Sequence, residues 1–429
     1  MTLLRYNLRK SAILTNDALL NFFCMFALLS ILRSYLMPIL VTIVVFVVGI
    51  FAVPAILDKP GIPDIPLPQH PGQGLEQQTA KDSSFGPIEI VTPKETPPAP
   101  PSMARMKQQG CIADGFLSDY GENANNMAKL INRSQCYYLH RALETWLRPP
   151  DFELAQKIKA RVNKQDLVYG MFIAEALDTK ANYFYPPENR DFEFAKMCRD
   201  GSENKWGEHT CQPSFEKREY MLYVQYITKQ AMDMGIQSFM FGQIFLQDNN
   251  DPNRSSLSAV MSSMHGYADS KGMKIVIGAQ TNDIEDESYL RMFDYIEGGV
   301  GLHTDGSIES GACFSRWWKK TGDWCWALLW NDKFSSKANN VFIHLDWSGR
   351  SGDDMSTFAR MSQNERFKTM QQLHAYFTSR NIGFFLPFLA PLPVDNGSCF
   401  GPKKRFYSPD NRYTCKDEET FNAILSGKK

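Results

Sequence analysis

Several familiar binding motifs are missing from this sequence of 429 residues. It contains no C-x-x-C pair, which argues against a zinc ribbon. No G-x-G-x-x-G follows its first predicted strand, and no G-x-x-x-x-G-K-[ST] occurs, so nucleotide binding lacks its usual support. The formal net charge is only −1, so no basic field indicates a nucleic-acid partner. We therefore expect a protein that binds no nucleic acid and works without a cofactor.

Charge is also missing from one long apolar run near the N-terminus, Tyr35–Leu57. A helix of about 20 apolar residues crosses the hydrocarbon layer, so this run predicts a transmembrane helix at 35–57. Arginine and lysine residues precede it and Asp58 follows, which places residues 1–34 in the cytoplasm and the rest of the chain outside. The sequence thus predicts a single-pass protein of the cytoplasmic membrane. A shorter apolar run at 18–32 leaves an interfacial helix or a second span open.

Eight of the nine cysteines follow the predicted span. An even number of cysteines without metal-binding spacing predicts disulfides in an oxidising compartment. Neighbouring cysteines enclose four short loops, so we expect the pairs Cys111–Cys136, Cys198–Cys211, Cys313–Cys325 and Cys399–Cys415. The alternative is a cytosolic protein with eight reduced core thiols. Disulfides agree with the single-span topology.

Residues 58–107 contain eleven prolines and read as a semi-extended linker that cannot pack a core. Beyond it, residues 108–429 alternate between strand and helix patterns. We expect helices at residues 122–147, 151–162, 216–234, 255–270, 285–294 and 364–380. We expect strands at 167–177, 237–246, 273–281, 295–303, 324–330, 340–347 and 382–389, with a possible eighth at 405–413. Such alternation predicts a parallel sheet, and the strand number favours a (β/α)8 TIM-type barrel over a doubly wound sheet.

Polar side chains follow most of the predicted strands, where barrels keep their chemistry. Two strings, Leu302–Asp305 and Ile343–Asp346, each place a His-x-Asp pair at the end of an apolar run. Since residues two apart share a face of a strand, both pairs are expected to point into the middle of the sheet. The candidate site residues are Glu175, Gln243, Gln280, His303, Asp305, Trp330, Asp332, His344, Asp346, Trp347 and Arg350.

Over residues 166–415 this pattern resembles (β/α)8-barrel glycoside hydrolases in architecture, without a family motif. The resemblance implies hydrolysis of an envelope or extracellular glycan by two carboxyl groups across the scissile bond. Glu175 and Asp346 are the preferred pair, with Asp305 and Asp332 as substitutes, because Asp346 follows an apolar strand and adjoins Trp347. Gln243, Gln280, His303, His344 and Arg350 would bind the sugar, and Trp330 and Trp347 would stack on it.

Two other functions remain open. The His-x-Asp pairs could hold a divalent metal in a hydrolase, although no His-x-His opens the first predicted strand. A barrel that binds a glycan without cleaving it is the non-catalytic alternative, since the last predicted strand ends without an acid. Any single acid at a strand end can also simply cap the following helix.

Overall fold

The computed structural model describes residues 97–427, except 249–253, 309–328, 348–352 and 393–398. Within these ranges no helix combines the length and the apolar character needed to cross a membrane. The predicted span at 35–57, the pair Cys313–Cys325, Arg350 and nearly all of the predicted strand at 324–330 lie outside the described residues.

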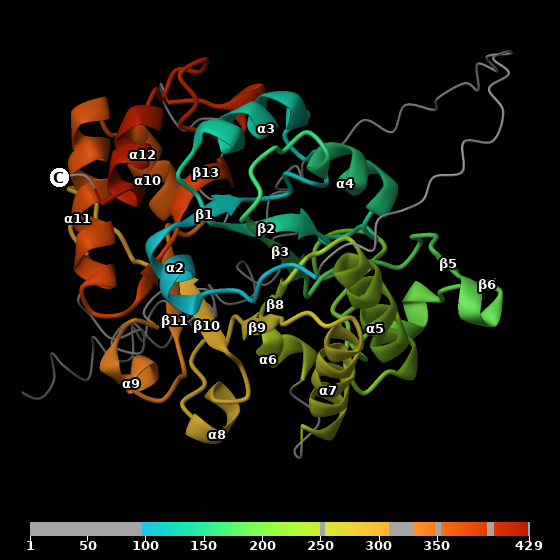
Figure 1. The fold of residues 1–429 in the computed structure, drawn as a ribbon. Helices are drawn as coiled ribbons and strands as arrows, with labels where there is room; N and C mark the ends of the chain where they lie inside the picture. The colour runs from blue at the N-terminus through green and yellow to red at the C-terminus, as the bar shows by residue number, and fades with distance from the viewer. Residues whose placement is uncertain (1–96, 249–253, 309–328, 348–352, 393–398, 428–429) are drawn as a thin grey trace, which may run out of the picture. The chain divides into compact units, whose positions relative to one another are not determined.

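The centre of the domain is a curled parallel sheet (Figure 1). Its strands, in chain order, are β1 (Gly110–Ala113), β2 (Tyr138–Glu144), β3 (Val168–Ile173), β8 (Ser238–Phe241), β9 (Val276–Ala279), β10 (Tyr295–Gly299), β11 (Val341–His344), β12 (Gly383–Phe384) and β13 (Leu386–Pro391). Each strand pairs in parallel with the next, from β1 to β12. Only Phe385 separates β12 from β13, and β13 pairs in parallel with β1. The ring of pairings therefore closes, with β12 and β13 in the eighth position, as in a TIM-type barrel.

Helices follow most of the strands. They are α2 (Met103–Gln108), α3 (Ala124–Arg133), α4 (Phe152–Lys159), α5 (Arg218–Asp233), α6 (Ile244–Gln247), α7 (Ser255–Ser270), α8 (Glu287–Leu290), α9 (Asp332–Ser335), α10 (Asp354–Arg360), α11 (Gln363–Thr378) and α12 (Glu418–Leu425), with short 3₁₀ turns η1 (Pro186–Glu188), η2 (Phe194–Met197) and η7 (Pro402–Lys404). The helix predicted at 255–270 has those bounds, and α11 begins with a Ser362–Glu365 capping box.

The helix predicted at 122–147 is wrong in its second half, where the chain forms β2. Its buried residues Leu139, Ala142 and Leu143 have helical spacing because a bulge interrupts the strand. Arg141 lies in the bulge with a φ of 55°, and it is the one residue of β2 that is not fully buried. β1 has only four residues and was not predicted. Glu175 therefore follows the third strand of the barrel and not the first.

The eighth strand predicted at 405–413 is also wrong as a barrel strand. β14 (Phe406–Tyr407) is short and pairs antiparallel with β13, at the edge of the parallel ring. The eighth position belongs to the strand predicted at 382–389. The two missed strands move the first four predicted strands two places along. Because β10 pairs directly with β11, the strands predicted at 340–347 and 382–389 move only one place.

Residues 97–108 cross the amino end of the barrel, so the prediction of a linker over 58–107 is wrong for residues 97–107, which pack on the domain and include most of α2. The Ala99 carbonyl accepts a hydrogen bond from Gln237, directly before β8, and the Ser102 N–H donates to the Tyr137 hydroxyl, directly before β2. Helix α2 follows and contacts β12 and β1. At the other end of the chain, the Leu425 carbonyl accepts from Gln109, directly before β1. Both ends of the described domain therefore lie at the amino end of the strands.

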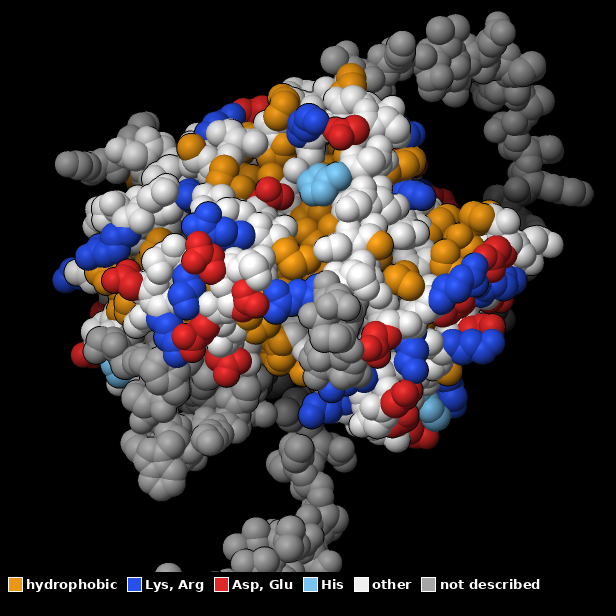
Figure 2. All heavy atoms as spheres, turned by 90° about the horizontal axis from the view of Figure 1, so that it is seen from below, with side chains coloured by type: hydrophobic (Ala, Val, Ile, Leu, Met, Phe, Trp, Pro, Cys, Tyr) orange, Lys and Arg blue, Asp and Glu red, His pale blue; other side chains and the backbone are white. Residues whose placement is uncertain are grey.

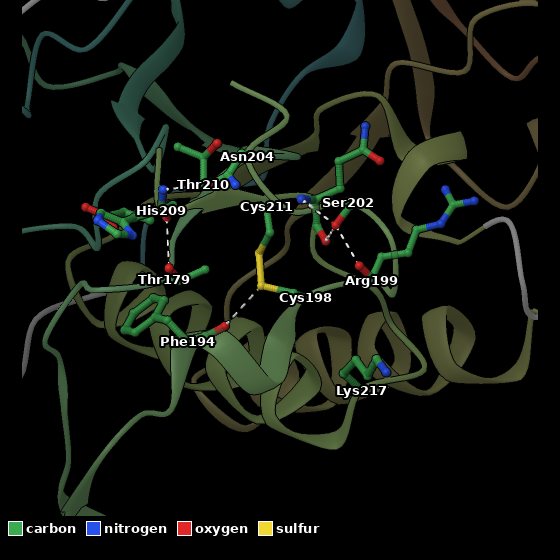
Figure 3. Close-up of a disulfide and its surroundings, with 12 residues drawn as sticks. Thr179, Phe194, Cys198, Arg199, Ser202, Asn204, His209, Thr210, Cys211 and Lys217 are labelled. Atoms are coloured by element: carbon green, nitrogen blue, oxygen red, sulfur yellow. Dashed lines mark hydrogen bonds between the residues drawn. A yellow bond between two sulfur atoms is a disulfide. The ribbon is translucent and has the colours of Figure 1, made fainter. Parts of the chain in front are cut away.

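The connection from β3 to α5 is a long excursion held by a disulfide (Figure 3). β4 (Leu177–Asp178) pairs with β7 (Thr210–Cys211), and β5 (Phe184–Tyr185) with β6 (Arg190–Asp191). Cys198 and Cys211 are joined, as are Cys111 and Cys136, and Cys399 and Cys415. These three predicted disulfides are confirmed.

On the face shown in Figure 2, positive and negative side chains are interleaved. Exposed ion pairs such as Lys271–Asp233 and Lys274–Asp269 illustrate this mixture. Charges mixed in this way largely cancel beyond about 8–10 Å in salt. Any ligand recognition is therefore local to a site.

Candidate functional site

Three buried acids come from the carboxyl ends of three adjacent strands. We call the carboxyl end of the barrel strands the mouth of the barrel. Asp114 directly follows β1, Glu144 is the last residue of β2, and Glu175 lies two residues after β3. Their exposed fractions are only 3%, 2% and 2%. Asp114 and Glu144 were missed by the sequence analysis, because the strands that carry them were missed.

Arg141 joins two of these acids. Its Nε lies 3.0 Å from Asp114 Oδ1 and 2.6 Å from Glu144 Oε1. Its guanidinium carbon lies 3.8 Å from the centre of the Phe172 ring and 4.9 Å from that of Trp347. The bulge in β2 turns this side chain toward the mouth, so the buried acids share a cation held between two aromatic rings.

Two acids and one cation leave an excess of negative charge in a buried place. Burial raises the pKa of Glu144 well above its ordinary value; the positive charge of Arg141 opposes this, and the nearby Asp114 adds to it. A carboxyl with a raised pKa keeps its proton to higher pH. Glu144 is therefore suited to hold a proton at the mouth.

Glu175 is oriented by two glutamines. The Gln243 side-chain amide donates to Glu175 Oε1, and the Gln243 backbone N–H donates to Gln280 Oε1 at 3.2 Å. Gly242 leaves room for this carboxyl, since a Cβ there would overlap Glu175 Oε2 and the Phe172 ring. The predicted site residues Glu175, Gln243 and Gln280 are thus brought together.

Below the mouth, Glu297 on β10 lies between two histidines in the interior of the barrel. Its Oε2 is 2.7 Å from His140 Nε2, and its Oε1 is 3.0 Å from His344 Nε2. The Gln280 amide also donates to Oε1, at 3.3 Å. Burial alone would raise the pKa of Glu297, but the charges and hydrogen bonds of the two histidines hold it well below its usual range. Glu297 is thus a buried carboxylate with a full set of donors.

Three hydroxyl groups extend this network. Tyr138 OH lies 2.9 Å from His140 Nδ1 and 2.9 Å from Ser238 Oγ, and Tyr295 OH lies 3.2 Å from Ser238 Oγ. Because His140 Nε2 faces a carboxylate and donates, its Nδ1 accepts from Tyr138. Burial lowers the pKa of His140, while Glu297 opposes that shift. We call these seven residues the interior network: Tyr138, His140, Ser238, Gln280, Tyr295, Glu297 and His344.

Asp346 and Trp347 follow β11 and lie at the mouth. The Asp346 N–H donates to Asp354 Oδ2 at 3.1 Å, and the same carboxylate accepts from the Gly301 and Leu302 N–H groups. This bonding fixes the segment that follows β11. The Trp347 ring centre lies 4.5 Å from that of His344. β3 and β11 occupy the third and seventh positions of the ring, so Glu175 and Asp346 come from opposite sides of the barrel.

Other predicted site residues lie elsewhere. His303 and Asp305 are exposed, and Asp305 accepts hydrogen bonds from the Ser307 N–H and hydroxyl in a surface turn. The prediction that this His-x-Asp pair points into the sheet is wrong, because β10 ends at Gly299. Asp332 is the exposed first residue of α9, where an acid favours a helix N-terminus.

Trp330 does not line the mouth. Its indole N–H donates to the Val300 carbonyl, and its ring packs edge-to-face on Tyr376 and Phe377 of α11, outside the sheet. With His303 and Asp305 on the surface, the two His-x-Asp pairs cannot share one metal. Among the described residues, no three His, Cys, Asp or Glu side chains are grouped to bind a metal ion.

No family model and no curated protein matches the chain. Solved structures similar to it include glycoside hydrolases. A GH27 β-L-arabinopyranosidase from Geobacillus stearothermophilus is 12% identical, with 46% of this chain and 54% of that chain covered and a TM-score of 0.30. This chain thus spans about half of that enzyme. An α-galactosidase from Thermus thermophilus is 11% identical, with 77% and 64% covered and a TM-score of 0.42.

A cyclic α-maltosyl-(1→6)-maltose hydrolase from Arthrobacter globiformis is 9% identical, with 74% of this chain and 76% of that chain covered and a TM-score of 0.44. Glycoside hydrolases, which the sequence pattern resembles, are thus among the solved structures to which the chain is similar. At these identities and scores the likeness does not identify a substrate or a catalytic residue. The barrel rests on its own strand pairings, and the site on its own contacts.

Proposed function

We propose that this chain hydrolyses a glycosidic bond in an envelope or extracellular glycan. The observation that carries this proposal is the cluster of buried acids at the mouth, next to glutamine amides and Trp347. Glycoside hydrolysis needs one carboxyl that holds a proton and one that is ionised. Amides and indole rings are the usual partners of sugar hydroxyls and sugar faces. The chemistry needs no cofactor.

Glu175 and Asp346 are the proposed pair that acts on the bond. They reach the mouth from opposite sides of the ring, as two groups that flank a bound sugar must. Glu175 is held by Gln243, which Gln280 fixes in turn, so its position is set before substrate arrives. Glu144, whose pKa is raised, would stay protonated to higher pH in the same site.

The test is hydrolysis of a panel of polysaccharides and wall glycans by the full-length chain. We expect Glu175→Gln and Asp346→Asn each to lose about 10²- to 10⁴-fold in rate, the range for a lost acid or base. Asp332→Asn, at the exposed start of α9, is the matched control and should keep full activity. Turnover that survives in both site variants, or that EDTA abolishes, would contradict the proposed mechanism.

A barrel that binds a glycan without cleaving it is the second candidate. It is favoured by the near-complete burial of Asp114, Glu144 and Glu175, which limits their access to substrate. Binding of a glycan by the wild-type chain without any turnover would establish this function in place of hydrolysis.

We further propose that residues 35–57 anchor the domain outside the cytoplasmic membrane, with residues 58–96 as a linker. The three disulfides support an oxidising compartment. Protease added to intact cells should release the domain. Protection of the domain in intact cells, with cleavage after lysis, would contradict this topology.

A further inference from the structure

We propose that Trp146 and Trp206 form a subsite that binds a pyranose ring of the glycan beside the acids of the mouth. This inference rests on the proposed function, since it names a part of the same site. It adds two residues that neither the sequence pattern nor the predicted strand ends indicated. It also gives the disulfide-bonded excursion after β3 a role in substrate binding.

Trp146 lies between two of the acids. It comes two residues after Glu144, and the next residue, Leu147, donates its N–H to the Ala176 carbonyl, directly after Glu175. Thr145 tightens the same contact, because its hydroxyl donates to the Phe172 carbonyl and accepts from the Ala174 N–H. The backbone that carries Trp146 is thus tied to the segment that carries Glu175.

Trp206 lies in a tight turn inside the loop closed by Cys198 and Cys211. Figure 3 shows the disulfide with Asn204, His209 and Thr210 of this turn. Asn204 and His209 both have left-handed backbones, with φ of 59° and 63°, which non-glycine residues adopt at a cost. The Trp206 N–H donates to Thr210 Oγ1, and the Asn204 side chain accepts from the His209 N–H. This strained, cross-linked turn fixes the Trp206 backbone.

The two indole rings meet edge-to-face, with centres 5.6 Å apart and planes at 70°. In this contact the edge of one indole packs against a face of the other, so the pair forms a corner, and both side chains remain partly exposed. A pyranose presents C–H groups on its faces, and these groups are attracted to the electron-rich face of an indole. The corner formed by Trp146 and Trp206 therefore suits a sugar ring next to the acids.

The test measures binding by the full-length chain, in the Glu175→Gln background so that ligand is not consumed. The probes are cellohexaose, maltohexaose, chitohexaose and mannohexaose, followed by calorimetry. We expect at least one to bind, and Trp206→Ala to raise its Kd about three- to tenfold, as for a lost stacking contact. Trp206→Phe should restore most of the affinity. The double variant Cys198→Ser with Cys211→Ser should also raise the Kd.

Phe184→Ala is the matched control, because Phe184 belongs to the same excursion and is 51% exposed on the β5–β6 hairpin (Figure 1). It should leave the Kd unchanged. An unchanged Kd in Trp206→Ala, or an equal rise in Phe184→Ala, would overturn the subsite. Failure of all four probes to bind would overturn it as well. Hydrolysis by the wild-type chain, measured separately, shows whether the proposed function itself stands.

Discussion

Glu144 and Glu297 are both fully buried in one barrel, yet their environments have opposite effects. Glu297 receives hydrogen bonds from His140, His344 and Gln280, and its pKa lies below its usual range. Glu144 shares the single cation Arg141 with Asp114, and its pKa is raised well above its usual value. Burial disfavours the charged form of both carboxylates. The number of hydrogen-bond donors and cations around each carboxylate therefore decides whether its pKa is raised or lowered.

The interior network is thus a structural region, and the mouth is the region suited to acid–base chemistry. In the interior network hydrogen bonds and close His–Glu contacts link the seven side chains, which rigidifies the centre of the barrel. Among the described residues of the mouth, Asp114 and Glu144 share one guanidinium, that of Arg141, and the raised pKa of Glu144 favours its protonated form. Such paired environments, which move two acids apart in pKa, are the usual mark of a site for acid–base chemistry.

The largest effect is expected in the interior network. Glu297→Gln removes a buried charge and leaves two histidines facing an amide, so we expect a loss of about 3–5 kcal/mol in the free energy of unfolding. Urea unfolding followed by circular dichroism measures it. Glu287→Gln, in the exposed pair with Arg291, is the matched control and should change stability little. A small loss of stability in Glu297→Gln would contradict a structural role for the interior network.

Two glycines allow the regions to be disturbed separately. A Cβ on Gly242 would overlap Glu175 at the mouth, and a Cβ on Gly278 would overlap the Tyr295 ring in the interior. We expect Gly242→Ala to lower the hydrolysis rate about 100-fold, since catalysis is sensitive to displacement of a reacting group. Gly278→Ala should instead cost about 1–3 kcal/mol of stability. Hydrolysis rates and urea unfolding would be measured for both variants. A loss of stability without a loss of rate in Gly242→Ala, or the reverse in Gly278→Ala, would contradict this separation.

The pH dependence of stability should have opposite signs for the two glutamates. Glu144 is protonated more readily in the folded state, so its stabilisation is complete below the ordinary pKa of 4.5 and is lost as pH rises through the raised value. Glu297 behaves inversely: its stabilisation holds above pH 4.5 and is lost as pH falls toward its lowered pKa.

Urea unfolding at a series of pH values measures this difference. Relative to Glu144→Gln, the wild type should lose stability as pH rises; relative to Glu297→Gln, it should lose stability as pH falls. Parallel curves for wild type and Glu144→Gln would show that Glu144 holds no extra proton.

The smallest effect is expected at the exposed acid of the surface turn. Within the described part of the chain, Asp305 hydrogen-bonds to Ser307 of its own turn, so Asp305→Asn should leave glycan hydrolysis at the wild-type rate. A fall in rate comparable to that of Glu175→Gln would place this turn in the active site and contradict its assignment to the surface.

Much of the fold could be predicted from the sequence where the chain repeats a regular period. Helices such as α7 and strands such as β8 and β9 follow apolar runs of the right length. β2 could not be predicted in this way, because its bulge at Arg141 gives the buried residues a helical spacing. The prediction of the site was affected most, because Asp114, Arg141 and Glu144 lie in or directly after the two missed strands.

The single-residue predictions show the same limit. Glu175, Gln243, Gln280, His344 and Trp347 follow strands that were correctly located, and they do meet at or just below the mouth. His303 and Asp305 lie only a few residues past a strand, but an exposed turn carries them away. Glu297 sits within a strand, and only three-dimensional pairing shows that its neighbours are two histidines.

The position of the described chain ends has a practical consequence. Residues 97–102 and Leu425 both lie at the amino end of the strands, on the side opposite the mouth. A tag, a bead or a sensor surface joined at either of these ends holds the barrel by its base. Immobilised in this way, the domain turns the mouth of the barrel away from the support and toward the solution.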